Sequence, residues 1–178
     1  MAYLWVVSRC LLALVFAVSA GGKLRDRASR RAFGQSVREM RLVPRPLAGL
    51  VAGLVIAAET VTAAALVLPA PPVVAAAGLA LAALLLTGFL GAIGLVLRRG
   101  RPLSCRCFGV SSVPLGPEHL VRNGALLAAA AAGLAAWLAG AVAVDRPMLA
   151  VAVPGAAVLA LLVMRLDDLV SLFRPAPG

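Results

Sequence analysis

Long stretches without charge dominate this chain, and the polar residues gather in the shorter segments between them. Uncharged runs cover residues 47–58, 73–97, 123–144 and 147–164. An α-helix rises about 1.5 Å per residue, so about 20 apolar residues cross a hydrocarbon core of about 30 Å. Continuous apolarity without a two-residue alternation favours helices over a barrel, because lipid tolerates only structures that satisfy their own backbone hydrogen bonds.

We therefore predict an all-α fold, a polytopic transmembrane helix bundle of four to five spans. Composition agrees, since 62% of the 178 residues are hydrophobic and 13% are charged, whereas roughly a quarter are charged in soluble domains. The run Pro69-Ala70-Pro71-Pro72 predicts a tight turn between two antiparallel helices. The expected organisation is a single membrane domain, residues 1–166, with spans at 3–22, 47–68, 73–97, 119–144 (shorter in practice) and 147–164, a basic juxtamembrane segment at 23–46, a loop at 98–118 and a polar tail at 167–178.

The first span has small residues near its end, Val18-Ser19-Ala20, as signal peptides have before their cleavage site. However, no basic segment precedes this span, Arg9 interrupts it, and four further spans follow. We therefore expect it to be inserted uncleaved.

The basic residues lie almost entirely on one side of the predicted membrane. Of the 17 lysines and arginines, all except Arg9 and Arg146 belong to that side. By the positive-inside rule this side is cytoplasmic, which predicts a multi-pass protein of the cell (plasma) membrane with its N-terminus outside. Orientation in the membrane accounts for the net charge of +10. The lipid bilayer is therefore the expected partner, and no nucleic acid partner is expected.

Two local patterns refine this description. Phe33, Val37 and Met40 recur at helical spacing in the basic segment, which favours an interfacial amphipathic helix whose arginines lie near lipid headgroups. Gly49 and Gly53 lie four residues apart in the second span, a pattern that lets a neighbouring helix approach closely.

Glu59 is the first residue with candidate chemistry. Counted from Leu47 it lies about 18 Å along the second span, near the bilayer midplane. A carboxylate is costly there unless it is paired, hydrated or protonated, so it should point into the bundle. It either handles protons or polarises a cofactor, or it makes a structural hydrogen bond to Thr60, Thr62 or Thr87, or to a polar group on another helix.

The start of the fourth span, His119-Leu120-Val121-Arg122-Asn123, is the second candidate. Exposed backbone N–H groups and a positive dipole favour anions at such a position. Arg122 is either an interfacial arginine that reaches lipid phosphate or a cation beside the preceding loop. His119, the only histidine, is a candidate proton acceptor there, or simply a solvated side chain.

That loop carries the third candidate, Cys105-Arg106-Cys107-Phe108-Gly109. A disulfide between two cysteines separated by one residue needs a bent backbone and is comparatively oxidising, which suits exchange. In the reduced pair, Arg106 and Arg101 would favour the thiolates. Inert cysteines remain an alternative, and no metal is assigned, because zinc needs more ligands than this pair supplies. Cys10 is expected to be a buried small hydrophobe or a third sulfur in a relay.

At these residues the chain resembles the methylamine utilisation protein MauE family, which belongs with the DoxX-like membrane proteins. The similar features are the C-x-C-F-G loop, the helix opening Leu120-Val121-Arg122-Asn123, the stretch from Arg9 to Lys23-Leu24, and a glutamate in the second helix, here Glu59. Arg106 departs from the small residue expected between the two cysteines, which puts their reactivity in doubt.

The resemblance implies a role in maturation of methylamine dehydrogenase, whose small subunit carries many disulfides and a tryptophan-derived quinone. It implies a thioredoxin-like partner and a secreted enzyme subunit as substrate. The catalytic candidates are Cys105 and Cys107, supported by Glu59, Arg106, Arg122 and Asn123. Whether the chain is itself an enzyme, a thiol–disulfide oxidoreductase, or an accessory protein is left open.

Charge counting and this role disagree about the side of the membrane. The positive-inside rule places the cysteine loop in the cytoplasm, whereas disulfides of secreted proteins form outside. Either the topology is reversed, or the loop folds back into the bundle, or electrons cross to Cys10 or to a quinone, the one cofactor considered. A non-redox scaffold or small-molecule carrier, with its site around Glu59, is the alternative function.

Overall fold

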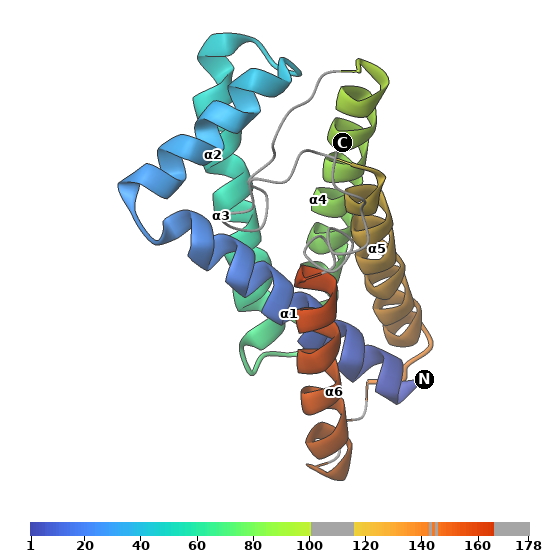
Figure 1. The fold of residues 1–178 in the computed structure, drawn as a ribbon. Helices are drawn as coiled ribbons and strands as arrows, with labels where there is room; N and C mark the ends of the chain where they lie inside the picture. The colour runs from blue at the N-terminus through green and yellow to red at the C-terminus, as the bar shows by residue number, and fades with distance from the viewer. Residues whose placement is uncertain (101–115, 143, 145, 166–178) are drawn as a thin grey trace.

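The computed structural model describes residues 1–100, 116–142, 144 and 146–165. Cys105, Arg106, Cys107 and the polar tail at 167–178 lie outside these residues. Within them the secondary structure is helical (Figure 1), and five helices are long and apolar enough to cross a membrane. The predicted all-α class is confirmed. The helices are α1 (Ala2–Leu24), α2 (Arg27–Met40), the short 3-10 helix η1 (Arg45–Leu47), α3 (Ala48–Val67), α4 (Pro72–Arg98), α5 (Pro117–Leu138) and α6 (Arg146–Met164).

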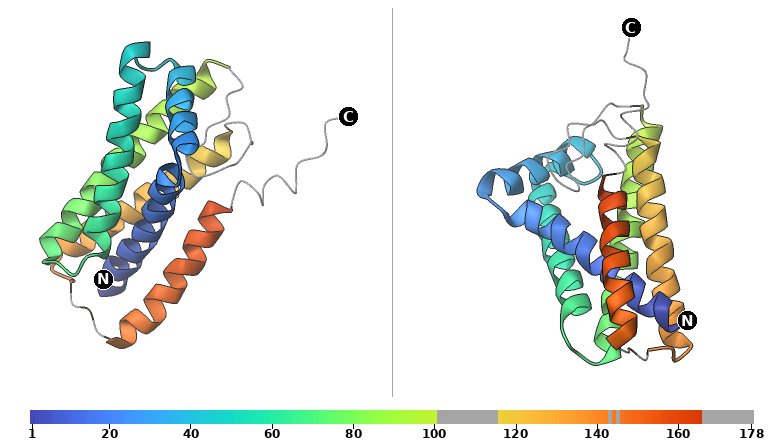
Figure 2. Two further views of the ribbon diagram at one scale, coloured as in Figure 1. Left: turned by 90° about the vertical axis from the view of Figure 1, so that its left-hand side faces the viewer. Right: turned by 60° about the horizontal axis from the view of Figure 1, so that its bottom comes forward.

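The first helix is the central one. It runs obliquely among the others (Figures 1 and 2) and contacts α2, α3, α4, α5 and α6. In an apolar stretch of 18 residues in this helix, 56% is buried inside the protein. The corresponding share is at most 33% for the other spans. Trp5, Leu12 and Phe16 are buried along its length. The remaining helices are consequently held together largely through α1.

Helices α3 and α4 form the predicted antiparallel hairpin. Helix α3 ends at Val67, the prolines occupy the turn, and α4 begins at Pro72 and packs against α3. Arg9 of α1 closes this end: its Nε donates to the carbonyl oxygen of Leu66 at 2.6 Å and its Nη2 to that of Leu68 at 2.9 Å. Because the last carbonyls of a helix have no partner within the helix, the partly buried guanidinium of Arg9 satisfies them. This explains how an arginine is tolerated inside the first span.

The basic segment forms the predicted amphipathic helix. Helix α2 starts at the N-cap residue Asp26, whose carboxylate accepts a hydrogen bond from the Ser29 backbone N–H at 2.6 Å. It ends at Arg41, which has a positive φ of 50°. The helix packs against α3, with Phe33 buried between them.

The glycine pattern of α3 does not bring a helix close. A Cβ added at Gly49 or Gly53 would meet nothing within 4 Å, so this prediction is wrong for the described part of the chain. Close approach occurs instead at Gly133 of α5, where an added Cβ would lie 2.8 Å from Leu79 and 2.9 Å from Ser8. Alanine is abundant on every helix face, so small residues alone do not identify the packed one.

Helices α5 and α6 complete the bundle. Helix α5 ends at Leu138, several residues before the limit expected from apolarity, and Gly140 follows with a φ of 72°. Helix α6 returns along α1 (Figure 2). Its contact face consists of alanines at a spacing of four, namely Ala152, Ala156 and Ala160, all buried.

Candidate functional site

A buried ion pair joins the first and third helices. The Nζ atom of Lys23, in the last turn of α1, lies 2.7 Å from both Oε1 and Oε2 of Glu59 in α3. Lys23 is 4% exposed and Glu59 is completely buried. Lys23 reaches a carboxylate far along α3 because the oblique α1 ends beside the middle of that helix (Figure 1). The carboxylate therefore points into the bundle, as its position in the apolar span required.

Two further side chains complete the surroundings of this pair. Ser19, one helical turn before Lys23, has its Oγ 2.7 Å from Nζ and donates to Oε1 of Glu59 at 3.2 Å. The ring of Phe33 in α2 lies beneath the ammonium, with its centroid 4.8 Å away. Such a cation–π contact gains strength when it is desolvated. The pair is thus held by α1, α2 and α3 together.

Both charges of this cluster are buried away from solvent. Removing two ions from water costs several kcal/mol each, and mutual attraction repays this only with good geometry and extra hydrogen bonds. Lys23 has both, since it meets both carboxylate oxygens and a hydroxyl. The arrangement can hold a proton or orient a polar group deep in the bundle.

The hydroxyl partners considered for Glu59 have other roles. Thr60 and Thr87 donate to carbonyl oxygens of their own helices, those of Ile56 and Ala83. The buried Thr62 Oγ1 has no hydrogen-bond partner among the described residues. The partner of Glu59 is Lys23, one of the basic residues expected only to set the orientation in the membrane. The available signal was its position, four residues after Ser19 and still inside the first apolar helix.

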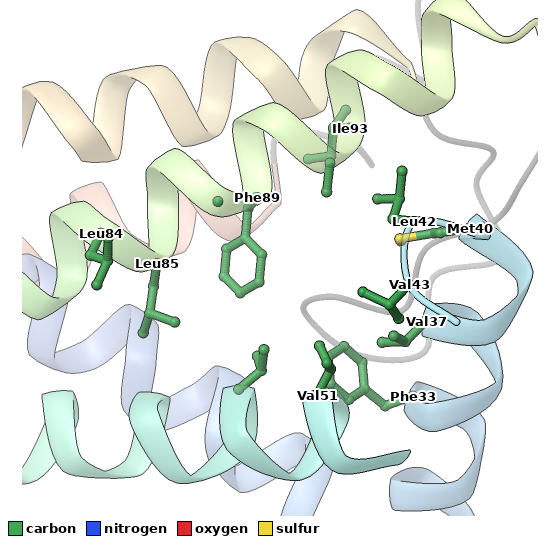
Figure 3. Close-up of a pocket in the computed structure, with 13 residues that line it drawn as sticks. Phe33, Val37, Met40, Leu42, Val43, Val51, Leu84, Leu85, Phe89 and Ile93 are labelled. Carbon is green, nitrogen blue, oxygen red and sulfur yellow. The ribbon is translucent and has the colours of Figure 1, made fainter. Parts of the chain in front are cut away.

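An apolar cavity of about 290 Å³ opens between α2, α3 and α4. Figure 3 shows Phe33, Val37 and Met40 of α2 facing Phe89 and Leu85 of α4 across it. Phe33 belongs to both features, because its ring lines the cavity and lies beneath Lys23. One aromatic side chain therefore separates a chamber of ligand size from a buried ion pair.

The start of α5 holds a second buried polar cluster. His119, Arg122 and Asn123 are all at most 3% exposed. The Nδ1 atom of His119 accepts from the Gly116 backbone N–H at 3.3 Å, and Asn123 Nδ2 donates to the His119 carbonyl oxygen at 2.7 Å. The buried Asn123 Oδ1 has no hydrogen-bond partner in the part of the chain that the structure describes.

This burial differs from two sequence interpretations. Arg122 is not the expected interfacial side chain that reaches lipid phosphate, because it is 3% exposed inside the protein. His119 is not solvated but packed, at 2% exposed. Both lie in the first turn or two after the loop that carries the cysteine pair. They remain candidates to act on that loop.

Of the three cysteines, one lies within the described residues and two lie outside them. Cys10 is half-buried against the core of α1 and is free of any disulfide in the described structure. The pair Cys105 and Cys107, with Arg106, lies outside the described residues. Among the described residues no group of three His, Cys, Asp or Glu side chains is arranged to hold a metal ion.

Five apolar helices around a buried ion pair define a multi-pass helical membrane protein. The methylamine utilisation protein MauE family matches residues 1–139, and the chain belongs to this family. The matched region contains Lys23, Glu59, the cysteine pair and the polar start of α5. No curated protein and no solved structure matches the chain.

Proposed function

We propose that this protein assists the maturation of a secreted redox enzyme, such as methylamine dehydrogenase, by thiol–disulfide exchange. The observation that carries the proposal is the family match, which runs through both cysteines of the loop between α4 and α5. The buried cluster of Arg122 and Asn123 after this loop supports it, since a fixed cation favours thiolates nearby.

The exchange needs only the two cysteines and a substrate disulfide. A thiolate of Cys105 or Cys107 attacks one sulfur of that disulfide, forming a mixed disulfide and releasing a substrate thiolate. The second cysteine then displaces the other substrate sulfur, so two electrons pass from the pair to the substrate, and a reduced thioredoxin-like partner returns the pair to the dithiol. The reverse sequence oxidises a substrate dithiol, and a quinone then takes up the two electrons and restores the disulfide. Arg106 and Arg122 stabilise the thiolates, and Glu59 relays protons.

The direct test is the double variant Cys105→Ser/Cys107→Ser in a host that depends on this protein. We expect maturation of the secreted enzyme to be lost, as read from the disulfide content of its subunit. Cys10→Ser is the matched control, because it also removes a thiol but leaves the pair. Unchanged maturation in the double variant, with normal protein levels in the membrane, rejects the proposal.

The side on which the pair acts is measured separately. Arg98 and Arg99 at the end of α4 precede the loop, which favours a cytoplasmic pair and electron transfer across the membrane. Alkylation of intact cells with a membrane-impermeant thiol reagent would then leave Cys105 and Cys107 unlabelled. Labelling before lysis would place them outside, next to the secreted substrate, and reverse the proposed topology.

A second candidate function rests on the cavity beside the ion pair. An apolar chamber with one polar cluster at its edge is the usual composition of a small-molecule site. The protein would then be a non-redox scaffold or carrier with its site around Glu59. In that case Glu59→Gln, at matched membrane levels, is more damaging than loss of the two thiols, whereas the exchange function predicts the opposite order.

A further inference from the structure

We propose that the groove between α2 and the first half of α3 binds the phosphate headgroup of an anionic phospholipid. This groove, of about 500 Å³, is lined by Arg30, Arg31, Arg38 and Gln35 from α2. It shares no lining residue with the apolar cavity, so the proposal is independent of the proposed function.

The arginines lack a counter-charge from the described protein. The two salt bridges among the described residues involve other groups. Of the nearby acids, Glu39 accepts a hydrogen bond from Gln35 at 2.8 Å and Asp26 accepts one from the Ser29 backbone N–H at 2.6 Å. Glu59 is paired with Lys23. Arg30, Arg31 and Arg38 are exposed on α2, and a cluster of basic residues beside a membrane span attracts anionic headgroups. Guanidinium groups bind phosphate through paired N–H donors.

The floor of the groove is shaped for a bulky group. Gly49 and Gly53 line it together with Ala52 and Ile56 of α3. A Cβ added at either glycine would stand in open space. Because no helix packs against Gly49 and Gly53, the surface of α3 is open there and forms a trough beside the arginines of α2.

The surroundings favour a lipid over a soluble phosphate. Leu50 and Leu54, the neighbours of the two glycines in α3, are 61% and 60% exposed. In a membrane these side chains face lipid tails, so the trough continues into the acyl region. A phosphate held at the arginines would have its chains along this apolar surface. Juxtamembrane basic clusters attract anionic lipids with about 1 kcal/mol per charge.

Native mass spectrometry of the full-length protein in mild detergent tests this. We expect phosphatidylglycerol to be retained at least about tenfold better than phosphatidylcholine. Arg30→Gln/Arg31→Gln/Arg38→Gln should remove this preference. The control, Arg25→Gln/Arg41→Gln/Arg45→Gln, loses the same charge outside the groove and should keep it. An equal loss in both variants would mean general charge attraction and would overturn the site.

A steric variant keeps the test valid if the charge variant folds poorly. Gly53→Leu fills the trough and retains every arginine, so phosphatidylglycerol retention should fall about as far. Gly91→Leu on α4, where an added Cβ also meets nothing within 4 Å, should bind like the parent protein. Full retention by Gly53→Leu would contradict the groove as the binding place.

Inorganic phosphate distinguishes the two sources of the anion. In millimolar excess it should leave bound phosphatidylglycerol in place, because it lacks the acyl chains that hold the lipid. Displacement of the lipid by phosphate alone would identify a soluble anion as the ligand, and the lipid proposal would fail.

Discussion

The ion pair between Lys23 and Glu59 gives the sharpest energetic prediction. Each partner is at most 4% exposed, and the charges meet at 2.7 Å. Breaking a buried pair by removing one partner costs about 3–5 kcal/mol, because the remaining charge is buried without compensation. Lys23→Met and Glu59→Met should therefore each lower the melting temperature by roughly 6–20 °C, at about 2–4 °C per kcal/mol for a chain of this size.

The double variant should behave quite differently. With both charges replaced by apolar side chains of similar length, no uncompensated ion is left, and such replacements are often neutral or stabilising. We expect Lys23→Met/Glu59→Met to lie within about 1 kcal/mol of the parent, which corresponds to a large coupling energy in the double-mutant cycle.

The assay is thermal unfolding in a mild detergent, followed by the fluorescence of Trp5 and Trp137. Gln35 and Glu39 offer a matched control, since they form an exposed hydrogen bond at 2.8 Å within one helix. Coupling between such a pair is only about 0.2–0.5 kcal/mol. If the two buried substitutions simply added, the pair would not be the interaction that holds α1 against α3, and the reasoning would be refuted.

Three further predictions concern packing and helix ends. Gly133→Ala places a Cβ 2.8 and 2.9 Å from side-chain carbons of α4 and α1, so it should cost about 1–3 kcal/mol in the same unfolding assay; Gly124→Ala, which meets nothing within 4 Å, should instead stabilise by about 0.5–1 kcal/mol. Arg9→Met removes two hydrogen bonds from the end of α3 and should cost about 1–3 kcal/mol, whereas an unchanged melting temperature would show that those carbonyls need no cap. The Ser29 N–H lowers the pKa of Asp26 below its ordinary value of 3.8. The contribution of this cap to stability is therefore present above about pH 3.8 and disappears as the pH falls through the lowered pKa. Asp26→Ala should abolish this component of the pH dependence of stability, and an identical pH profile in the variant would contradict the prediction.

The apolar pattern predicted the helices well because length and hydrophobicity are local properties. The runs at 73–97 and 147–164 correspond closely to α4 and α6. The amphipathic helix of the basic segment was also predictable, since Phe33, Val37 and Met40 repeat at helical spacing and a polar N-cap precedes them.

The partners of the charged residues could not be predicted in the same way. Glu59 was expected to point inward, but its partner depended on the oblique course of α1, which no local pattern encodes. From the sequence alone, Lys23 was therefore indistinguishable from the other basic residues of the juxtamembrane segment. The predicted close contact at Gly49 and Gly53 failed for a related reason. A pair of small residues permits a second helix to pack closely, but the arrangement of all the helices decides whether one lies there.

The central position of α1 has a consequence for biogenesis. This helix leaves the ribosome before α3, yet each of its two charged side chains has a main partner on α3 or at its end: Arg9 at the carbonyl oxygens of Leu66 and Leu68, and Lys23 at Glu59. Until α3 has entered the bilayer, α1 carries two cations without their final neighbours. Chains interrupted before α3 is made should therefore be recognised by quality-control proteases, and the first three helices must assemble as one unit during synthesis.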